Sequence, residues 1–258
     1  MASVEITYIG HASFRFVSEE GTTIYIDPWL DGNPLAAIGL DAVKRADLVV
    51  VTHGHNDHIR HAFEICQKTG AAFVGNYEAA LVARAHGLDP ARQVVGLNPG
   101  GSAAFRDVRI TLTQAVHASG SLSPNLIYGP PPEGLYFHPD GGACGVVLSF
   151  QNGIAVYHSS DTALFSDMQL IGQMYRPQVA ILPIGGKYTM GVREAVRAAS
   201  LLRPDVVIPC HYGEAVGQPA DVERFRQGVE LLSANLAVAA LEPGQTLRYT
   251  AAHWEVRR

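Results

Sequence analysis

The sequence predicts an α/β fold, and three features lead to this prediction. An unbroken apolar run from Leu48 to Val51 has no polar alternation, as expected for a strand buried on both faces of a sheet. Short alternating segments precede it and indicate an antiparallel meander. Residues 176–183 and 203–209 both begin with Arg-Pro and continue as apolar runs, with an amphipathic helix between them. Strand, helix and strand in this order imply a right-handed parallel crossover.

The first half of the chain alternates short strands with two helices. Besides the strand at Leu48, strands are expected at residues 4–9, 13–17, 22–26, 72–74, 94–97, 102–105 and 108–115. The helices are expected at residues 59–69 and from about 78 to 86, where Asp89-Pro90 then breaks the chain. This order places a helix directly after the buried strand.

The second half begins with residues 120–142, which are rich in proline, glycine and aromatic side chains. Long irregular loops in compact domains are usually functional lids or disordered inserts, and the aromatics favour a lid. The elements expected after it are a hairpin of strands 144–150 and 154–157 across an Asn-Gly turn, helices 163–175 (capped by Thr162), 192–202 and 221–233, and strands 236–240 and 246–250. No linker-like boundary interrupts the chain, so we expect a single domain over residues 1–258.

Length and composition exclude several classes of function. Of 258 residues, 47% are hydrophobic and 17% charged, so the chain buries a substantial core. The net charge of −5 comes without a long run of one sign, which argues against nucleic acid or a membrane surface as the main partner. No apolar stretch is long enough to span a bilayer. Residues 1–16 lack a secretory pattern, and three widely spaced cysteines suit a reducing compartment, so a cytoplasmic protein is expected.

A cluster of metal-binding residue types follows the buried strand. His53, His55, Asp57 and His58 occur within six residues, and Gly54 lets the chain turn sharply. His53 and His55 lie two positions apart, so both imidazoles can point the same way. Burying four such groups without a partner would be costly. Because imidazole and carboxylate are the ligands that borderline divalent metals prefer, we interpret the cluster as a metal site.

Three further strand ends carry the same residue types. His117 and Asp161 each follow an expected strand, and His211 follows the second strand of the parallel crossover. His117 or His211 alone would be better explained as a core histidine with its hydrogen bonds satisfied. Ligands in open α/β sheets gather at the carboxyl ends of strands, so we expect these residues to join the cluster in one site.

The motifs around these residues resemble the metal-ligand motifs of the metallo-β-lactamase superfamily. The matching segments are residues 6–14, 27–28, 53–58, 160–165, 182–186, 189–191 and 208–213. The resemblance covers nearly the whole chain. It is closest to a bacterial and archaeal branch of metal-dependent hydrolases related to ascorbate-6-phosphate lactonase and to the N-acylphosphatidylethanolamine phospholipase D group. It implies a four-layer αββα sandwich with the metals at one edge.

The resemblance also implies a centre of two divalent metal ions. Residues that resemble the ligands of the first metal are His53, His55 and His117; those of the second are Asp57, His58 and His211; and Asp161 resembles the bridging carboxylate. Zinc is favoured as the metal. Manganese and iron are alternatives, because histidine and carboxylate ligands suit all three metals. A hydroxide between the metals would cleave an ester, lactone or phosphodiester bond in a small-molecule substrate. Asp57 would orient the attacking water or accept its proton.

Four further residues are candidates for supporting or substrate-binding roles. His11 and Asp27 stand at turns where strands end, and each is either a local turn former or a partner of a metal-bound imidazole. Lys187 and Tyr188 follow another strand end, where the lysine would suit an anionic substrate group. Relatives often carry histidine at the position of Lys187 and glycine at that of Ser160, so substrate preference does not transfer from the family.

Two alternatives to a hydrolase remain at this point. Some members of the superfamily bind iron for redox chemistry, so a metal-binding oxidoreductase or sensor is the first. The 258 residues contain no flavodoxin-like or rubredoxin-like segment, which weighs against electron transfer. The second is a partner-binding scaffold with a vestigial site, which the intact ligand set disfavours. The sequence identifies neither the substrate nor the bond, and it leaves the oligomeric state, a homo-oligomer included, open.

Overall fold

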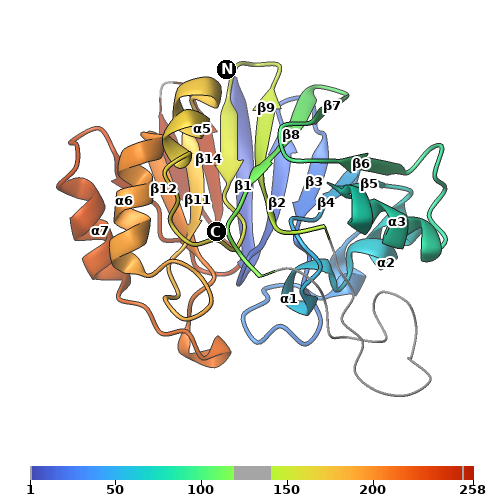
Figure 1. Cartoon of the computed structure of the whole chain (residues 1–258), viewed down its shortest axis with the longest axis horizontal. Helices are drawn as coiled ribbons and strands as arrows, with labels where there is room; N and C mark the ends of the chain where they lie inside the picture. Colours follow the sequence, from blue (N-terminus) through green and yellow to red (C-terminus); the bar gives the residue numbers. More distant parts are fainter. Residues whose placement is uncertain (1, 119–140, 252) are drawn as a thin grey trace.

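Two mixed β-sheets form the middle of the molecule (Figure 1). The structure, a computed structural model, describes residues 2–118, 141–251 and 253–258. The strands of the first sheet are β1 (Ser3–Gly10), β2 (Ser13–Ser18), β3 (Thr23–Ile26), β4 (Leu48–Val50), β5 (Ala72–Asn76), β6 (Val94–Leu97), β14 (Thr246–Thr250) and β15 (Trp254–Arg257). Their spatial order is β15-β14-β1-β2-β3-β4-β5-β6. Pairing is antiparallel from β15 to β3 and parallel from β3 to β6.

The second sheet contains the repeated Arg-Pro segments. Its strands are β7 (Ser102–Phe105), β8 (Val108–Gln114), β9 (Cys144–Phe150), β10 (Ala155–His158), β11 (Val179–Pro183), β12 (Val206–Cys210) and β13 (Ala237–Val238), in the order β13-β12-β11-β10-β9-β8-β7. Strands β10 to β13 pair parallel, and β7 to β10 pair antiparallel. Val179 lies opposite Val206, so the parallel pairing predicted for the two repeats is confirmed.

Helices cover the outer face of each sheet and complete four layers (Figure 1). They are α1 (Asn56–Ile59), α2 (Ala62–Thr69), α3 (Tyr77–Ala85), α5 (Met168–Tyr175), α6 (Val192–Leu202) and α7 (Val222–Glu230), with short 3-10 helices at Leu40–Ala42 and Glu214–Val216. Apolar side chains such as Phe16 and Ile208 fill the space between the sheets. Helices α2 and α3 pack on the first sheet and α5 to α7 on the second. The predicted αββα sandwich is confirmed.

Strand direction explains why one edge of the sandwich collects the candidate residues. Strands β1, β3 and β4 run the same way in the first sheet, since β1 and β3 both pair antiparallel with β2 and β3 pairs parallel with β4. By the same reasoning β8, β10, β11 and β12 run one way in the second sheet. The residues that follow these strand ends are His11, Asp27, His53, His117, Asp161, Lys187 and His211.

The helix expected over residues 59–69 is wrong in its bounds, because the chain forms two helices there. Helix α1 ends at Ile59 and α2 begins at Ala62. Between them, the His61 backbone N–H donates to Pro28 O at 3.0 Å, and His61 Nδ1 accepts from Leu30 N at 3.1 Å. The loop after β3 thus takes the His61 backbone N–H that a continuous helix would bond internally, and it also holds the His61 ring.

The helix expected over residues 163–175 begins later than predicted, and Thr162 does not cap it. Thr162 Oγ1 accepts from Val116 N at 2.9 Å and donates to Ala163 O at 2.7 Å, so it joins the end of β10 to the segment after β8. Helix α5 begins at Met168 instead. Strand β15 was not predicted, although its four residues alternate between apolar and polar side chains.

Two expectations concern segments rather than elements. The proposed lid at residues 120–142 lies outside the described residues, apart from Gly141 and Gly142. Within the described part of the chain, no helix combines the length and the apolar character needed to cross a membrane.

The end of β1 generates a prediction about stability. Gly10 has φ +146°, and a Cβ atom there would press on the carbonyl oxygen of Leu35. We expect Gly10→Ala to lower the free energy of unfolding by about 2–3 kcal/mol, measured by chemical denaturation. Gly21→Ala is the matched control, since Gly21 also has positive φ but open space around it, and should cost about 1 kcal/mol. Equal losses in the two variants would contradict the steric argument.

Candidate metal centre

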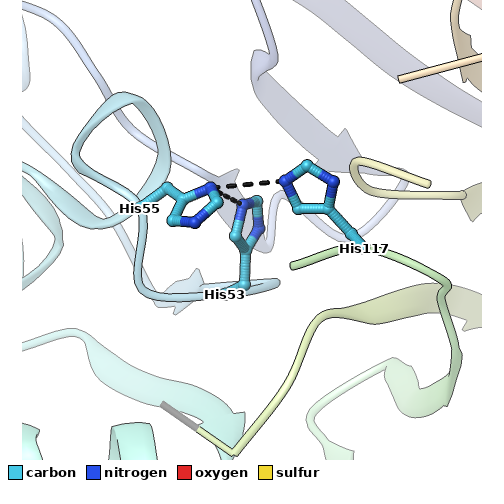
Figure 2. A group of neighbouring side chains, drawn as sticks. All are labelled: His53, His55 and His117. Carbon is cyan, nitrogen blue, oxygen red and sulfur yellow. Dashed lines mark hydrogen bonds between the residues drawn. The ribbon is translucent and has the colours of Figure 1, made fainter. Parts of the chain in front are cut away.

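Three histidines from two strand ends face one another (Figure 2). His53 follows β4, His55 precedes α1, and His117 follows β8. His55 Nδ1 lies 3.0 Å from His53 Nε2 and 3.3 Å from His117 Nε2. Two nitrogens bound to one tetrahedral zinc at about 2.0–2.1 Å stand about 3.3 Å apart. The spacing therefore fits three ligands of one metal ion.

Asp161 connects this histidine group to a second one. Its Oδ2 atom lies 3.0 Å from His211 Nε2, 3.3 Å from His58 Nε2 and 3.6 Å from His117 Nε2. Asp161 itself is buried at the end of β10. One carboxylate oxygen thus contacts both groups, which is the arrangement expected of a ligand shared by two metal ions.

Asp57 lies at the more open side of the second group. Its Oδ2 atom is 3.0 Å from His11 Nε2, 3.5 Å from His211 Nε2 and 3.8 Å from His58 Nε2. The His11 ring also packs on the His211 ring, with centroids 3.8 Å apart. The Asp57 side chain is 35% exposed, whereas these three histidines are buried. Asp57 can therefore reach a molecule in the cavity as well as a metal.

Asp27 orients two of the candidate ligands. Its Oδ2 atom accepts from His58 Nδ1 at 2.8 Å and from Thr52 Oγ1 at 2.6 Å. Since Thr52 Oγ1 donates its hydrogen to Asp27, its 3.0 Å contact with His53 Nδ1 requires the imidazole to donate. Both His58 and His53 then carry hydrogen on Nδ1 and direct Nε2 toward the centre. Of the two roles expected for Asp27, the structure shows the contact with an imidazole.

Two residues that contact the candidate ligands, Thr52 and Gln218, were missed by the sequence analysis. Thr52 stands at the strand end, and its side-chain type gives no metal signal. Gln218 lies in the loop after β12, with its amide 3.2 Å from His211 Nδ1 and its Oε1 buried without a partner among the described residues. If the Gln218 amide is turned by 180°, its Oε1 atom accepts a hydrogen bond from His211 Nδ1. His211 Nε2 is then the ring nitrogen that can bind a metal. Only tertiary contact identifies this residue.

Unpartnered buried nitrogens test whether a metal fits. His58 Nε2 and His211 Nε2, as well as His11 Nδ1, are buried and make no well-aligned hydrogen bond to a described residue, although Asp161 Oδ2 lies within 3.3 Å of the first two. Buried polar atoms almost always have a partner, so the first two fit ligand atoms that await an ion. Three groups of side chains lie close enough to hold a metal: His53, His55 and His117; His53, His58 and Asp161; and His11, Asp57 and His211. The expected ligands of the second metal were Asp57, His58 and His211. In the structure, Asp57 and His211 instead group with His11, and His58 groups with Asp161.

The charges of the cluster balance one another. Burial keeps the pKa of His53 well below its usual value, so this imidazole is neutral. Burial would also lower the pKa of His211, but the Asp161 and Asp57 carboxylates outweigh it and raise the pKa to about 9. The pKa of His58 rises for the same reason, and His58 in turn lowers the pKa of both carboxyls despite their burial. Without metal, protons on His58 and His211 therefore offset the carboxylates, and a metal would replace these protons.

A cavity of about 660 Å³ opens onto these residues. Its floor includes His55, Asp57, His117, Asp161 and His211, and its walls include Val116, Ala118, Ala163, Lys187, Tyr188 and Thr189. Lys187 Nζ lies 4.9 Å from the centre of the Tyr188 ring, and both side chains are exposed. The structure thus brings the two expected substrate residues to the wall of the cavity that contains the candidate ligands.

Comparison with known proteins supports the same chemistry. Residues 5–211 match the family model described as the Beta-lactamase superfamily domain. The chain is 42% identical over 243 residues to a UPF0173 metal-dependent hydrolase of Methanopyrus kandleri, with 94% of this chain and 99% of the relative covered.

Solved structures extend the likeness to the fold. Igni18, a metallo hydrolase from the hyperthermophilic archaeon Ignicoccus hospitalis, superposes with a TM-score of 0.82 at 38% identity, over 96% of this chain and 99% of that chain. YhfI from Bacillus subtilis, a metallo-β-lactamase fold protein, gives a TM-score of 0.66 at 13% identity, over 96% and 100% of the two chains. At that identity the second likeness concerns the fold alone. The metallo-β-lactamase fold expected from the sequence is confirmed.

The ligand geometry predicts the metal content of purified protein. We expect about two divalent ions per chain, mainly zinc, in protein produced without a metal-affinity tag and measured by elemental analysis. His58→Ala and Asp161→Ala should each lose at least about half of this metal, because each removes contacts at the junction of the two groups. His253→Gln, at an exposed histidine before β15, should keep the full content. Wild-type protein that holds no metal even after reloading would contradict the assignment.

The raised pKa of His211 predicts how metal affinity depends on pH. His211 is protonated below a pKa of about 9 and must lose this proton to bind a metal. Affinity for zinc should therefore increase from pH 7 to pH 9, by up to about tenfold per pH unit for each proton displaced. Competition with a chromophoric chelator at several pH values measures it, and His211→Gln should flatten the slope. A wild-type affinity that is constant over this range would contradict the proton-bearing site.

Proposed function

Because the chain belongs to the UPF0173 family of metal-dependent hydrolases, we propose that it cleaves an ester, lactone or phosphodiester bond in a small anionic molecule, at a centre of two metal ions. The observation that carries this proposal is the contact of one Asp161 oxygen with histidines of both groups. The lactone alternative also rests on the sequence resemblance to ascorbate-6-phosphate lactonase, which stays a prediction.

We assign the ligands as the family resemblance implies. The residues assigned to one metal are His53, His55 and His117, those assigned to the other are Asp57, His58 and His211, and Asp161 is assigned to both. Zinc is our preferred metal, with manganese and iron as alternatives. When bound, the two metals would polarise the scissile group and lower the pKa of water toward about 7. His11 then serves to hold Asp57 in place through the 3.0 Å hydrogen bond from Nε2.

Asp57 is the residue we assign to the attacking water. It is ionised at neutral pH, because the neighbouring His58, His11 and His211 side chains lower the pKa of its carboxyl group despite burial. Asp57 borders the cavity and is held by His11, so its carboxylate is placed to contact a water molecule there. Orienting the water and accepting its proton both remain roles that we propose for Asp57.

Lys187 supports an anionic substrate. It is the one lysine or arginine among the described residues that line the 660 Å³ cavity. No carboxylate of the described residues lies within ion-pair distance of its ammonium group, and its ammonium group faces the Tyr188 ring. Its charge is thus free to meet a carboxylate or phosphate on the substrate.

Activity assays test this proposal directly. Zinc-loaded protein should hydrolyse at least one class among aryl esters, lactones and aryl phosphodiesters. At saturating metal, Asp57→Asn should lower kcat by about 10²–10⁴-fold, since it weakens the group that positions the water. If the loaded wild-type protein hydrolyses none of the three classes, the proposal fails.

Substrate charge provides the second arm of the same experiment. Lys187→Gln should raise KM for an anionic member of the active class by about tenfold while leaving a neutral member unchanged. Lys44→Gln, at an exposed lysine outside the cavity, is the matched control and should change neither value. An equal effect of Lys187→Gln on both substrates would show that the lysine acts on structure rather than on substrate charge.

A further inference from the structure

A second cavity adjoins the metal centre. It has a volume of about 440 Å³ and shares Asp57 and Tyr188 with the cavity that contains the candidate ligands. We call it the Trp29 chamber, after the residue that forms its flat wall. Pro34 and Val216 add apolar surface, and Arg60 and Asn56 are polar residues in its lining. Asp57 and Tyr188 border both spaces, so the two cavities adjoin at these side chains.

The position of Trp29 is fixed by contacts with the site. Its ring meets the His11 ring edge to face, with centroids 5.4 Å apart and an angle of 89°. Its backbone N–H donates to Ser13 Oγ at 2.9 Å, and its carbonyl accepts from Asn33 Nδ2 at 2.9 Å. The indole is half-buried, so one part of it remains available to a ligand. A preformed flat apolar wall of this kind suits an aromatic or other flat apolar group.

Arg60 adds a positive charge to the same chamber. It follows the last residue of α1, three positions after Asp57, and its side chain is exposed. Among the described residues, its guanidinium has no carboxylate within ion-pair distance and no hydrogen-bond partner. Arginine presents a rigid fork of donors that matches the oxygens of a carboxylate or phosphate. An unpaired arginine beside an apolar wall therefore fits a ligand that is both apolar and anionic.

We propose that the Trp29 chamber binds the far end of the substrate, an apolar and flat group that carries an oxyanion paired with Arg60. This inference rests on the proposed function only in calling the ligand a substrate, since binding in the chamber needs no turnover. The scissile bond then lies at the metals, and Lys187 serves the opposite part of the molecule. The substrate class is thus an amphiphilic anion rather than a compact polar one.

Fluorescence of Trp29 tests the proposal. The chain has two tryptophans, and Trp254→Phe leaves Trp29 as the reporter, since Trp254 lies on edge strand β15 and lines neither cavity. Metal-loaded protein in this background is titrated with phenyl phosphate, and we expect saturable quenching. Arg60→Gln should weaken the affinity by about tenfold or more, and Arg60→Lys, which keeps the charge but not the fork, by less. Thermal unfolding verifies that these exposed substitutions leave the fold intact.

Matched controls separate the chamber from the metal cavity. Lys187→Gln should leave the affinity sensed by Trp29 within about twofold, and phenol and inorganic phosphate should each bind at least about tenfold more weakly than phenyl phosphate. The proposal is overturned if Trp29 is not quenched, if Arg60→Gln leaves the affinity unchanged, if Lys187→Gln weakens it equally, or if inorganic phosphate binds as tightly. Quenching that depends on Arg60, in a protein that hydrolyses nothing, would refute the hydrolase proposal and support the chamber. Hydrolysis without such quenching would support the hydrolase proposal and refute the chamber.

Discussion

The buried carboxylate of Asp27 is the constraint on which the metal centre depends. Its oxygens accept from Thr52 N, Thr52 Oγ1 and His58 Nδ1, and its backbone carbonyl accepts from Ser13 Oγ. A buried carboxylate is tolerated only with such donors, so the ends of β2, β3 and β4 and helix α1 must all arrive in register. Because Asp27 also fixes which nitrogens of His53 and His58 carry hydrogen, one side chain sets the orientation of a candidate ligand in each metal group.

The same cluster would be a poor choice for stability alone. Asp161, His53, His58 and His211 are all buried, and well-packed apolar side chains in their place would often be as stable or more so. The carboxylates hold protons on His58 and His211, which keeps the metal-free centre close to charge balance. A divalent metal can take over the role of these protons. The cluster is therefore best understood as a site prepared for cations, whose folding cost is offset when they bind.

The sequence predicted those parts of the fold and site that depend on local pattern. Apolar runs located the strands, and because strand ends share an edge, residues as distant as His53 and His211 could be placed together from the sequence pattern alone. The errors arise where tertiary contacts override local pattern. His61 bonds to Pro28 and Leu30 and divides one expected helix, Thr162 turns toward Val116 rather than capping α5, and Gln218 reaches His211 from a loop without any motif. None of these contacts has a signature in the neighbouring sequence.

Chemistry and selectivity have different structural origins in this molecule. The candidate ligands His53, His117, Asp161 and His211 follow strand ends whose positions the two sheets fix, and Asp57 and His58 lie in the short helix α1 after β4. Lys187, Tyr188 and Arg60 are exposed and lie at or beyond the ends of such elements, where substitution leaves the sheets untouched. Membership of the family therefore identifies the reaction type, which depends on the fixed residues. The substrate that we propose rests instead on the two cavities that meet at Asp57, whose charges and apolar surface would suit a molecule that extends into both.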